Sequence, residues 1–327
     1  MRSTFSSLLL LAFAVSAKAA AVPTSVHSAI ASVAEPDSAR RSDFTSFAAD
    51  TVTTLSAEEL EDFAPYTQFA RAAYCPSSKL TNWDCGEACE ANSGFQPTLT
   101  GGDGNAVQLY FVGYWPEENS VVVSHEGTDP TQFLSLLTDA NLAQENLNTS
   151  LFPGVDDSVW VHSGFADQQA LTGPIVLAET KRLIAAKGAT TVTLVGHSLG
   201  GALAEMDAVY MTLNLPSNIH VKAVTYGTPR VGNAAWASFF DATVPDFVRV
   251  NNEKDLIPIV PGRGLGYAHP HGEVHIVSPG DAVACSPDDD ATDSACTIAT
   301  VPNIAVGNIL NHLGPYEGIM IGTIFCT

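Results

Sequence analysis

Short runs of aliphatic and β-branched residues alternate with longer helix-forming stretches through the middle of the chain. Three apolar runs, at 192–195, 221–225 and 247–250, have the length and composition of buried strands. We expect one helix over 165–187 and another from Leu199 to about residue 213. Strands that alternate with helices predict a mostly parallel central sheet flanked by helices, which is an α/β fold.

The pattern before these elements predicts a helix and a hairpin. Ser56 and Glu59 have the spacing of a capping box, so a helix is expected from Ser56 to about Ala73. Apolar and polar residues alternate over 107–111, which predicts a strand with one buried face. The run 120–124 then returns as its antiparallel partner, and we expect this hairpin to join the larger sheet.

The N-terminus has the pattern of a secretory signal. A basic residue, a short apolar block and Ala17-Lys18-Ala19 follow in order, so residues 1–19 are predicted to be a signal peptide of a secreted protein. Residues 20–54 are rich in Ala, Ser and Thr and are interpreted as a propeptide or flexible arm. Residues 55–327 are assigned to one domain. No other apolar run approaches the ~20 residues that a transmembrane helix needs.

Charge and cysteine content narrow the possible partners. The chain has 35 acidic and 14 basic residues, a net charge of −21, which argues against nucleic-acid binding. Six cysteines fit an oxidising compartment, and none lies in a C-x-x-C pair, so no metal site is expected. Sequence proximity favours the pairs Cys85–Cys89 and Cys285–Cys296, and leaves Cys75–Cys326. Asn148 begins a glycosylation sequon.

The segment from Val192 to Ala202 carries the clearest chemical signal. A strand-like run leads into Gly196-His197-Ser198-Leu199-Gly200 and then into a helix. This is the pattern of a nucleophile elbow, in which a sharp turn projects a serine hydroxyl from the sheet. The helix would begin directly after Ser198, so the free N–H of Leu199 would face developing negative charge.

A serine nucleophile needs a base and a carboxylate, which follow it in chain order on this type of fold. Asp255 comes just after the strand 247–250 and precedes an apolar segment, so it is the candidate acid. Four histidines downstream are candidate bases. His312 follows every predicted strand and is mildly favoured, whereas the others cluster in one polar segment: His269, His271 and His275.

A short apolar helix is predicted after the strand 120–124. Asp129 and Pro130 are typical of a helix start, and the helix carries an unusual number of apolar side chains: Phe133, Leu134, Leu136 and Leu137. It is either a helix packed in the core or a mobile lid over an apolar cleft. The residues alone do not separate these two interpretations.

Several separated motifs together resemble the fungal secreted lipases of the class 3 lipase family, which also includes feruloyl esterases. The resemblance covers roughly Ser56 to the end of the chain. It rests on these motifs: Gly127-Thr128, Val161-His162-Ser163-Gly164-Phe165, Gly196 to Ala202, Tyr226 to Asn233, Asn252 to Pro261, and Asn311-His312-Leu313. It implies an α/β-hydrolase fold with Ser198 as nucleophile, Asp255 as acid and His312 as base.

The resemblance also implies the parts around the triad. Thr128 and Leu199 would form the oxyanion hole through their backbone N–H groups, and Asp139 is the nearest candidate to orient the Thr128 hydroxyl. The helix from Asp129 to Thr138 would be a lid. The same three disulfides would be expected. The chain departs from the family pattern at His125-Glu126, where an arginine is common, and it lacks the usual lid tryptophan.

These observations predict a secreted serine hydrolase that cleaves carboxylic esters through an acyl-enzyme without a cofactor. A triacylglycerol lipase that acts on lipid at an oil–water interface is the leading hypothesis. A feruloyl or general carboxylesterase on the same scaffold is the alternative. A catalytically inactive hydrolase fold used for binding is a hypothesis of another class.

Overall fold

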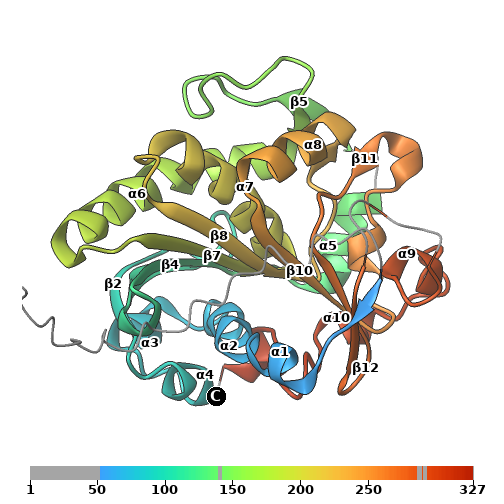
Figure 1. Cartoon of the computed structure of the whole chain (residues 1–327), viewed down its shortest axis with the longest axis horizontal. Coiled ribbons are helices and arrows are strands. Elements are labelled where there is room, and N and C mark those ends of the chain that lie inside the picture. Colours follow the sequence, from blue (N-terminus) through green and yellow to red (C-terminus); the bar gives the residue numbers. More distant parts are fainter. Residues whose placement is uncertain (1–51, 139–141, 286–288, 290–292, 327) are drawn as a thin grey trace, which may run out of the picture. The chain divides into compact units, whose positions relative to one another are not determined.

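A nine-stranded sheet forms the centre of the protein in the computed structural model, which describes residues 52–138, 142–285, 289 and 293–326 (Figure 1). Its strands lie in the order β1-β13-β12-β10-β8-β7-β4-β3-β2. In chain order they are β1 Thr53–Thr54, β2 Gln96–Gly101, β3 Tyr110–Trp115, β4 Ser120–His125, β7 Thr191–His197, β8 His220–Tyr226, β10 Asp246–Asn252, β12 Glu273–Ser278 and β13 Asp281–Ala284.

The middle of the sheet is parallel and its two edges are antiparallel. Strands β4, β7, β8, β10 and β12 pair in parallel, while β2 and β3 on one side and β13 and β1 on the other pair antiparallel with their neighbours. All residues of β4, β7 and β10 are buried, as expected for strands covered on both faces. The prediction of a mostly parallel central sheet is confirmed.

Helices cover both faces of this sheet. In Figure 1, α6, α7 and α8 lie above the strands, and α1 and α2 lie below them. The helices are α1 Ala57–Glu61, α2 Ala64–Ala72, α3 Ser77–Asn82, α4 Glu87–Ala91, α5 Pro130–Thr138, α6 Ser163–Lys187, α7 Leu199–Asn214, α8 Ala234–Thr243, α9 Thr297–Thr300 and α10 Ile309–His312. None of the helices in the described ranges is both long and apolar enough to span a bilayer.

The first helix is shorter than the sequence predicts. The capping box is present: the Ser56 hydroxyl accepts from the Glu59 N–H, and the Glu59 carboxylate accepts from the Ser56 N–H. However, the predicted continuous helix to Ala73 is wrong, because it breaks at Phe63 and restarts as α2. Pro65 lies in the first turn of α2, where its missing N–H costs no hydrogen bond within the helix.

Two other boundaries differ from expectation. Strand β3 begins at Tyr110, so the alternating run 107–111 is mostly the approach to the strand rather than the strand itself. Thr53 and Thr54 pair with β13, so the end of the segment interpreted as a flexible arm is part of the sheet. The predicted signal peptide and the rest of that arm, residues 20–51, lie outside the described residues.

A second, small antiparallel sheet packs against α8, and the sequence did not predict it. It has the order β11-β9-β6-β5, with strands of two or three residues each. These are β5 Gln144–Asn146, β6 Trp160–His162, β9 Gly232–Asn233 and β11 Tyr267–Ala268. Segments this short carry too few residues for a periodic pattern.

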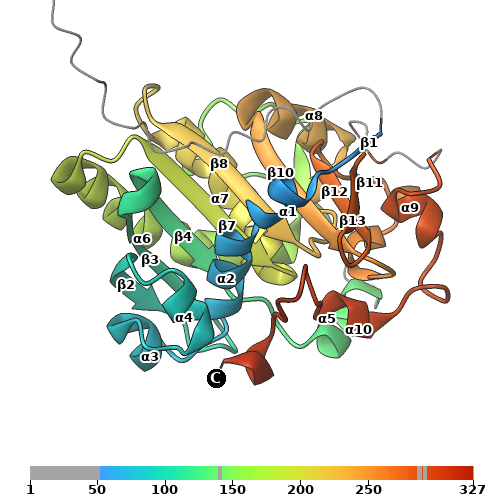
Figure 2. The same cartoon turned by 60° about the horizontal axis from the view of Figure 1, so that its bottom comes forward.

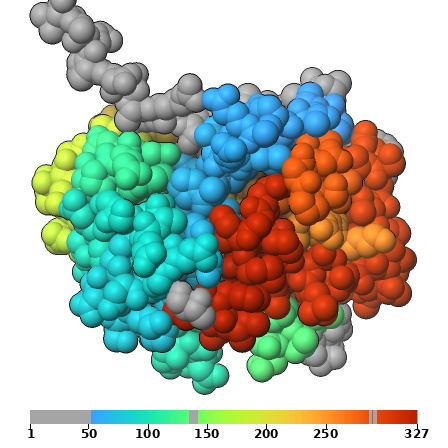
Figure 3. Space-filling view, turned by 90° about the horizontal axis from the view of Figure 1, so that it is seen from below, coloured from blue at the N-terminus to red at the C-terminus, as the bar shows by residue number. Residues whose placement is uncertain are grey.

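Three disulfides join the pairs expected from sequence proximity, Cys75–Cys326, Cys85–Cys89 and Cys285–Cys296. The first connects the end of α2 with the C-terminal segment. Figure 3 shows these two parts side by side, with α1 and α2 in blue against the red segment. The disulfide therefore holds together two parts of the chain that are 251 residues apart in sequence.

Candidate active site

Ser198 lies at the sharp turn between β7 and α7, at the carboxyl end of the strand. Its backbone has φ +59° and ψ −128°, a conformation that non-glycine residues rarely adopt. A Cβ on Gly196 would lie 2.0 Å from the carbonyl oxygen of Gly200, and a Cβ on Gly200 would lie 2.2 Å from that of His125. The two glycines are thus needed for the turn to form, and the turn presents the serine.

Asp255 and His312 come together beside this turn. Nδ1 of His312 lies 2.8 Å from Oδ2 of Asp255, and both side chains are buried. Because a carboxylate only accepts, Nδ1 carries the proton and Nε2 carries the lone pair. Gly227, with φ +53°, leaves the space for this pair, since a Cβ there would lie 2.7 Å from the carboxylate and 2.8 Å from the imidazole.

The two atoms of the candidate triad that would react are not used in hydrogen bonds within the described residues. Both the Ser198 hydroxyl and Nε2 of His312 are buried, and neither has a hydrogen-bond partner among the described residues. His197 directly precedes the serine, and the centroid of its ring lies 4.3 Å from the centroid of the His312 ring. The serine turn and the histidine are therefore in the same cluster, and neither reactive atom is committed to a structural bond.

The other candidate bases have structural roles. Nε2 of His269 bonds the carbonyl of Pro258, and Nδ1 of His271 bonds the carboxylate of Asp241. Both ring nitrogens of His275 bond backbone carbonyl oxygens. Of the four candidates, His312 is the one bonded to the Asp255 carboxylate.

Thr128 and Leu199, the expected oxyanion-hole residues, line one cavity of about 400 Å³. Leu199 is the first residue of α7, so its N–H belongs to the free N-terminal turn of that helix. Phe133 and Phe165 form apolar walls, and polar side chains lie around the same space: Asn105, Gln108, Gln132, His162 and Gln168. A cavity of this kind beside the serine could receive an acyl chain.

Helix α5 borders this cavity and is the segment predicted as a lid. The Asp129 carboxylate accepts from the N–H groups of Thr131 and Gln132, as an N-cap does. Phe133 is 1% exposed and packs near Phe165, so part of the helix is anchored in the core. The side chains of Leu136 and Leu137, and all of Asp139, lie outside the described residues. Figure 2 shows α5 next to α10, which carries His312.

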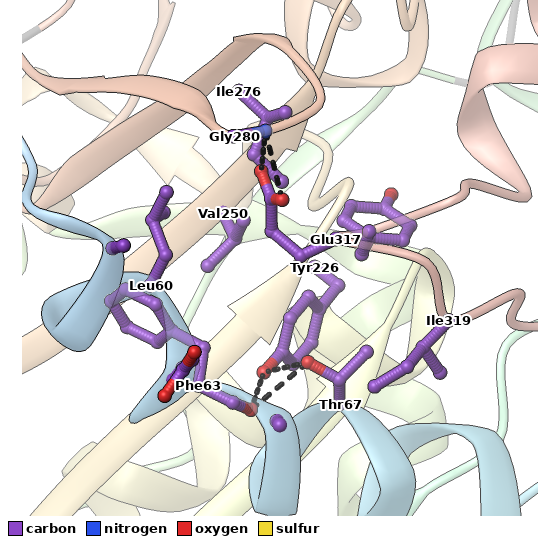
Figure 4. A pocket seen from close by; sticks show the side chains of 13 residues that line it. Leu60, Phe63, Thr67, Tyr226, Val250, Ile276, Gly280, Glu317 and Ile319 are labelled. Carbon is purple, nitrogen blue, oxygen red and sulfur yellow. Dashed lines mark hydrogen bonds between the residues drawn. The ribbon is translucent and has the colours of Figure 1, made fainter.

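A second cavity, of about 290 Å³, lies away from the serine, between α1, α2 and the sheet (Figure 4). Leu60, Phe63, Val250 and Ile276 make it apolar, and the Glu317 carboxylate at its edge accepts from the N–H of Gly280. Neither the candidate triad nor the expected oxyanion-hole residues, Thr128 and Leu199, line it, so it is not part of the candidate active site.

Burial changes the acidity of several groups near the elbow. Desolvation raises the pKa of Glu126 to about 7 and that of Glu205, on α7, to about 8. Desolvation, together with the charge of His312, lowers the pKa of His197 well below its ordinary value. The packing of His197 against His312 was not predicted, because nothing in the local pattern indicates a contact 115 residues away.

The sheet order and the serine at the turn after β7 define an α/β-hydrolase. The chain matches the model of the family described as Lipase (class 3) over residues 122–265. It is 30% identical over 230 residues to the secreted mono- and diacylglycerol lipase LIP1 of Malassezia globosa. The aligned region covers 69% of this chain and 72% of that protein. The chain belongs to the class 3 lipase family.

A second relative is similar over a shorter stretch, and two solved structures are similar in fold. The secreted mono- and diacylglycerol lipase LIP2 of Malassezia restricta is 31% identical over 157 residues, 48% of this chain, so the chain spans only half, 50%, of that relative's length. The structure of lipase II from Rhizopus niveus matches with TM-score 0.73 and 24% identity, over 85% of this chain and 100% of that one. A lipase structure from Rhizopus microsporus var. chinensis matches with TM-score 0.72, 26% identity and coverage of 84% and 92%.

Proposed function

We propose that this protein is a secreted serine esterase that hydrolyses acylglycerols, with Ser198, Asp255 and His312 as its catalytic triad. The observation that carries the proposal is the buried Asp255–His312 pair beside a serine whose hydroxyl is unbonded among the described residues. The names of the Malassezia relatives favour mono- and diacylglycerols as substrates. These relatives are also named as secreted, in agreement with the predicted signal peptide and the three disulfides.

The reaction begins with the serine. His312 Nε2 takes the proton of the Ser198 hydroxyl as the oxygen attacks the ester carbonyl carbon. Asp255, bonded to Nδ1, stabilises the imidazolium that forms. The tetrahedral intermediate then breaks its carbon–oxygen bond, His312 gives its proton to the leaving alcohol, and the acyl group stays on Ser198.

Water completes the cycle. His312 takes a proton from a water molecule, the resulting oxygen attacks the acyl carbon, and the carboxylic acid leaves as Ser198 regains its proton. In both halves the negative oxygen would be held by the N–H groups of Thr128 and Leu199. Loss of one such donor in serine hydrolases typically costs about 100- to 1,000-fold in kcat.

Apolar side chains near the site suit a lipid surface. Ile304, Val306 and Leu310 are all substantially exposed, at 48%, 45% and 67%. They precede His312, and Leu310 belongs to α10, which packs against α5. Exposed apolar side chains next to the mouth of an active site commonly mark a contact surface. We propose that this segment, with α5, rests on the lipid phase during hydrolysis.

Labelling with an organophosphonate and assays on several substrates test the proposal. Wild-type protein should be labelled at Ser198 and should release fatty acid from diolein, and Ser198→Ala should do neither. Folded protein that is never labelled would instead support a binding protein with an inactive hydrolase fold. Preference for methyl ferulate over diolein and triolein would support a feruloyl esterase.

Asn148 is exposed, and a shift in mass after endoglycosidase treatment would report a glycan there.

A further inference from the structure

The side chain of His197 makes two hydrogen bonds that the proton transfers do not use. Its Nδ1 lies 2.6 Å from the hydroxyl oxygen of Tyr74, and its Nε2 lies 2.7 Å from the backbone carbonyl oxygen of His312. All three side chains are buried. A chain of contacts thus runs from the end of α2, through the residue before the serine, to the backbone of the candidate base.

The protonation of His197 follows from its partners. The carbonyl oxygen of His312 can only accept, so Nε2 must carry a proton. Burial disfavours the charged imidazolium, so the other nitrogen, Nδ1, holds a lone pair. The Tyr74 hydroxyl then has to donate to Nδ1. Because a neutral histidine can place its proton on either nitrogen, a hydroxyl that donates to Nδ1 stabilises the form that binds the carbonyl.

Tyr74 is itself held from two sides. It immediately precedes Cys75, whose disulfide to Cys326 joins α2 to the C-terminal segment. Its hydroxyl also lies against Gly127, the residue before Thr128 of the expected oxyanion hole, where a Cβ would lie 2.3 Å from the hydroxyl oxygen. The tyrosine therefore touches both the strand end that leads to the oxyanion hole and, through His197, the base.

We infer that Tyr74 is a positioning residue for His312, acting through His197. Its donation to Nδ1 stabilises the form of His197 with the proton on Nε2, and this N–H bonds the backbone of the base so that Nε2 of His312 stays oriented for proton transfer. It also favours an uncharged His197 ring, 4.3 Å from an imidazole that becomes positively charged in the reaction. This inference rests on the proposed function.

The groups around His197 determine how much activity is lost when the Tyr74 hydroxyl is removed. The Tyr316 hydroxyl donates to the same His312 carbonyl at 3.1 Å, so the loss of one anchor leaves the other. The titratable groups that face His197 are Tyr74, His312 and Tyr316. Asp255 lies beyond His312, and Glu126 acts on Tyr74. A partial loss of rate is therefore expected when the Tyr74 hydroxyl is removed, rather than inactivation.

A double-mutant cycle tests the inference. Tyr74→Phe should lower kcat on a soluble p-nitrophenyl ester about tenfold, with KM within about twofold, because only the aim of the base is disturbed. In His197→Gln the amide nitrogen can donate to the His312 carbonyl without a tyrosine. Adding Tyr74→Phe to His197→Gln should then change kcat by less than about twofold, whereas a mere packing role would make the two effects multiply.

A matched control is Tyr226→Phe. Tyr226 is also fully buried and pairs with His197 through the backbone of β7 and β8, but its hydroxyl bonds residues at α2, Thr67 and Phe63, rather than the His197 ring. Its kcat should stay near that of wild type. Equal losses of kcat in Tyr74→Phe and Tyr226→Phe, or multiplying losses in the cycle, would overturn the inference. If His197→Gln does not fold, the comparison of the two tyrosine variants alone decides. Inactive wild-type protein would instead refute the proposed function.

Discussion

The carboxylate of Asp255 accepts a hydrogen bond from Nδ1 of His312 at 2.8 Å, inside the protein and next to the serine turn. The pair joins the loop after β10 with α10, 57 residues further along the chain. It leaves Nε2 of the histidine as the free basic nitrogen.

Asp255→Asn should keep the fold and lower kcat by about 1,000- to 10,000-fold, because the amide would favour the wrong tautomer of His312. Steady-state kinetics on a soluble ester gives this number. Asp241→Asn is the matched control, since Asp241 bonds His271 rather than His312 and its loss should leave kcat nearly unchanged. Comparable losses in the two variants would move the acid elsewhere.

Gly200→Ala should destabilise the protein and abolish labelling of Ser198. Its Cβ would lie 2.2 Å from a backbone oxygen of β4, which the sheet holds in place, so the elbow itself must move. Thermal unfolding and phosphonate labelling measure the two effects. Gly262→Ala is the control, because a Cβ there meets nothing within 4 Å and φ is −67°. A normal elbow in Gly200→Ala would contradict the proposed geometry.

Glu205→Gln should stabilise the protein more at higher pH. Burial raises the pKa of Glu205 in the folded state to about 8, so between about pH 4.5 and 8 the unfolded chain loses this proton while the folded protein keeps it. The free energy of unfolding of the wild type therefore falls as pH rises through this window. Glutamine does not titrate, so the variant does not show this fall, which is on the order of 3 kcal/mol at neutral pH.

Calorimetric unfolding from pH 5 to pH 8 measures this difference. The amide oxygen at position 205 can still accept from the Trp236 indole N–H, so the packing of the site is kept. The exposed Glu61→Gln variant should show no such trend. A constant difference between Glu205→Gln and wild type at all pH values would mean that burial does not hold the Glu205 proton.

Ile304→Ser combined with Val306→Ser should lower the ratio of activity on emulsified diolein to activity on a dissolved short-chain ester, by about tenfold from the loss of apolar area. Leu171→Ser is the control, because Leu171 is similarly exposed but belongs to α6 rather than to the segment 304–310. The same drop for Leu171→Ser would show that surface hydrophobicity in general, and not this segment, controls lipid binding.

The sequence predicted the elements whose signals are local. The turn around Ser198 was recognised because a strand, two glycines and a helix follow one another without interruption. Asp255 was found by its place after β10. The choice of His312 needed the family resemblance, because its pairing with Asp255 is a tertiary contact. The break between α1 and α2 was missed because the apolar pattern continues across Phe63 although the backbone hydrogen bonding does not.

The contacts of Tyr74 lay beyond any sequence pattern. The tyrosine looks like the end of an ordinary amphipathic helix, and His197 looks like a variable position within the elbow. Their shared relation to His312 arises only when the disulfide and the sheet bring α2 and α10 together. Buried polar contacts between distant elements are specified by the whole fold, so neither residue carries a signal in its own neighbourhood.

The Cys75–Cys326 link has a practical consequence for making this protein. A bacterial cytoplasm keeps thiols reduced, so protein produced there would retain its elbow but lose the covalent tie that presses α2 against the segment carrying the histidine. Such material would fold into a mixture in which only part reacts with an active-site probe. Secretion through yeast, or export to the periplasm, is the sounder route to a homogeneous sample.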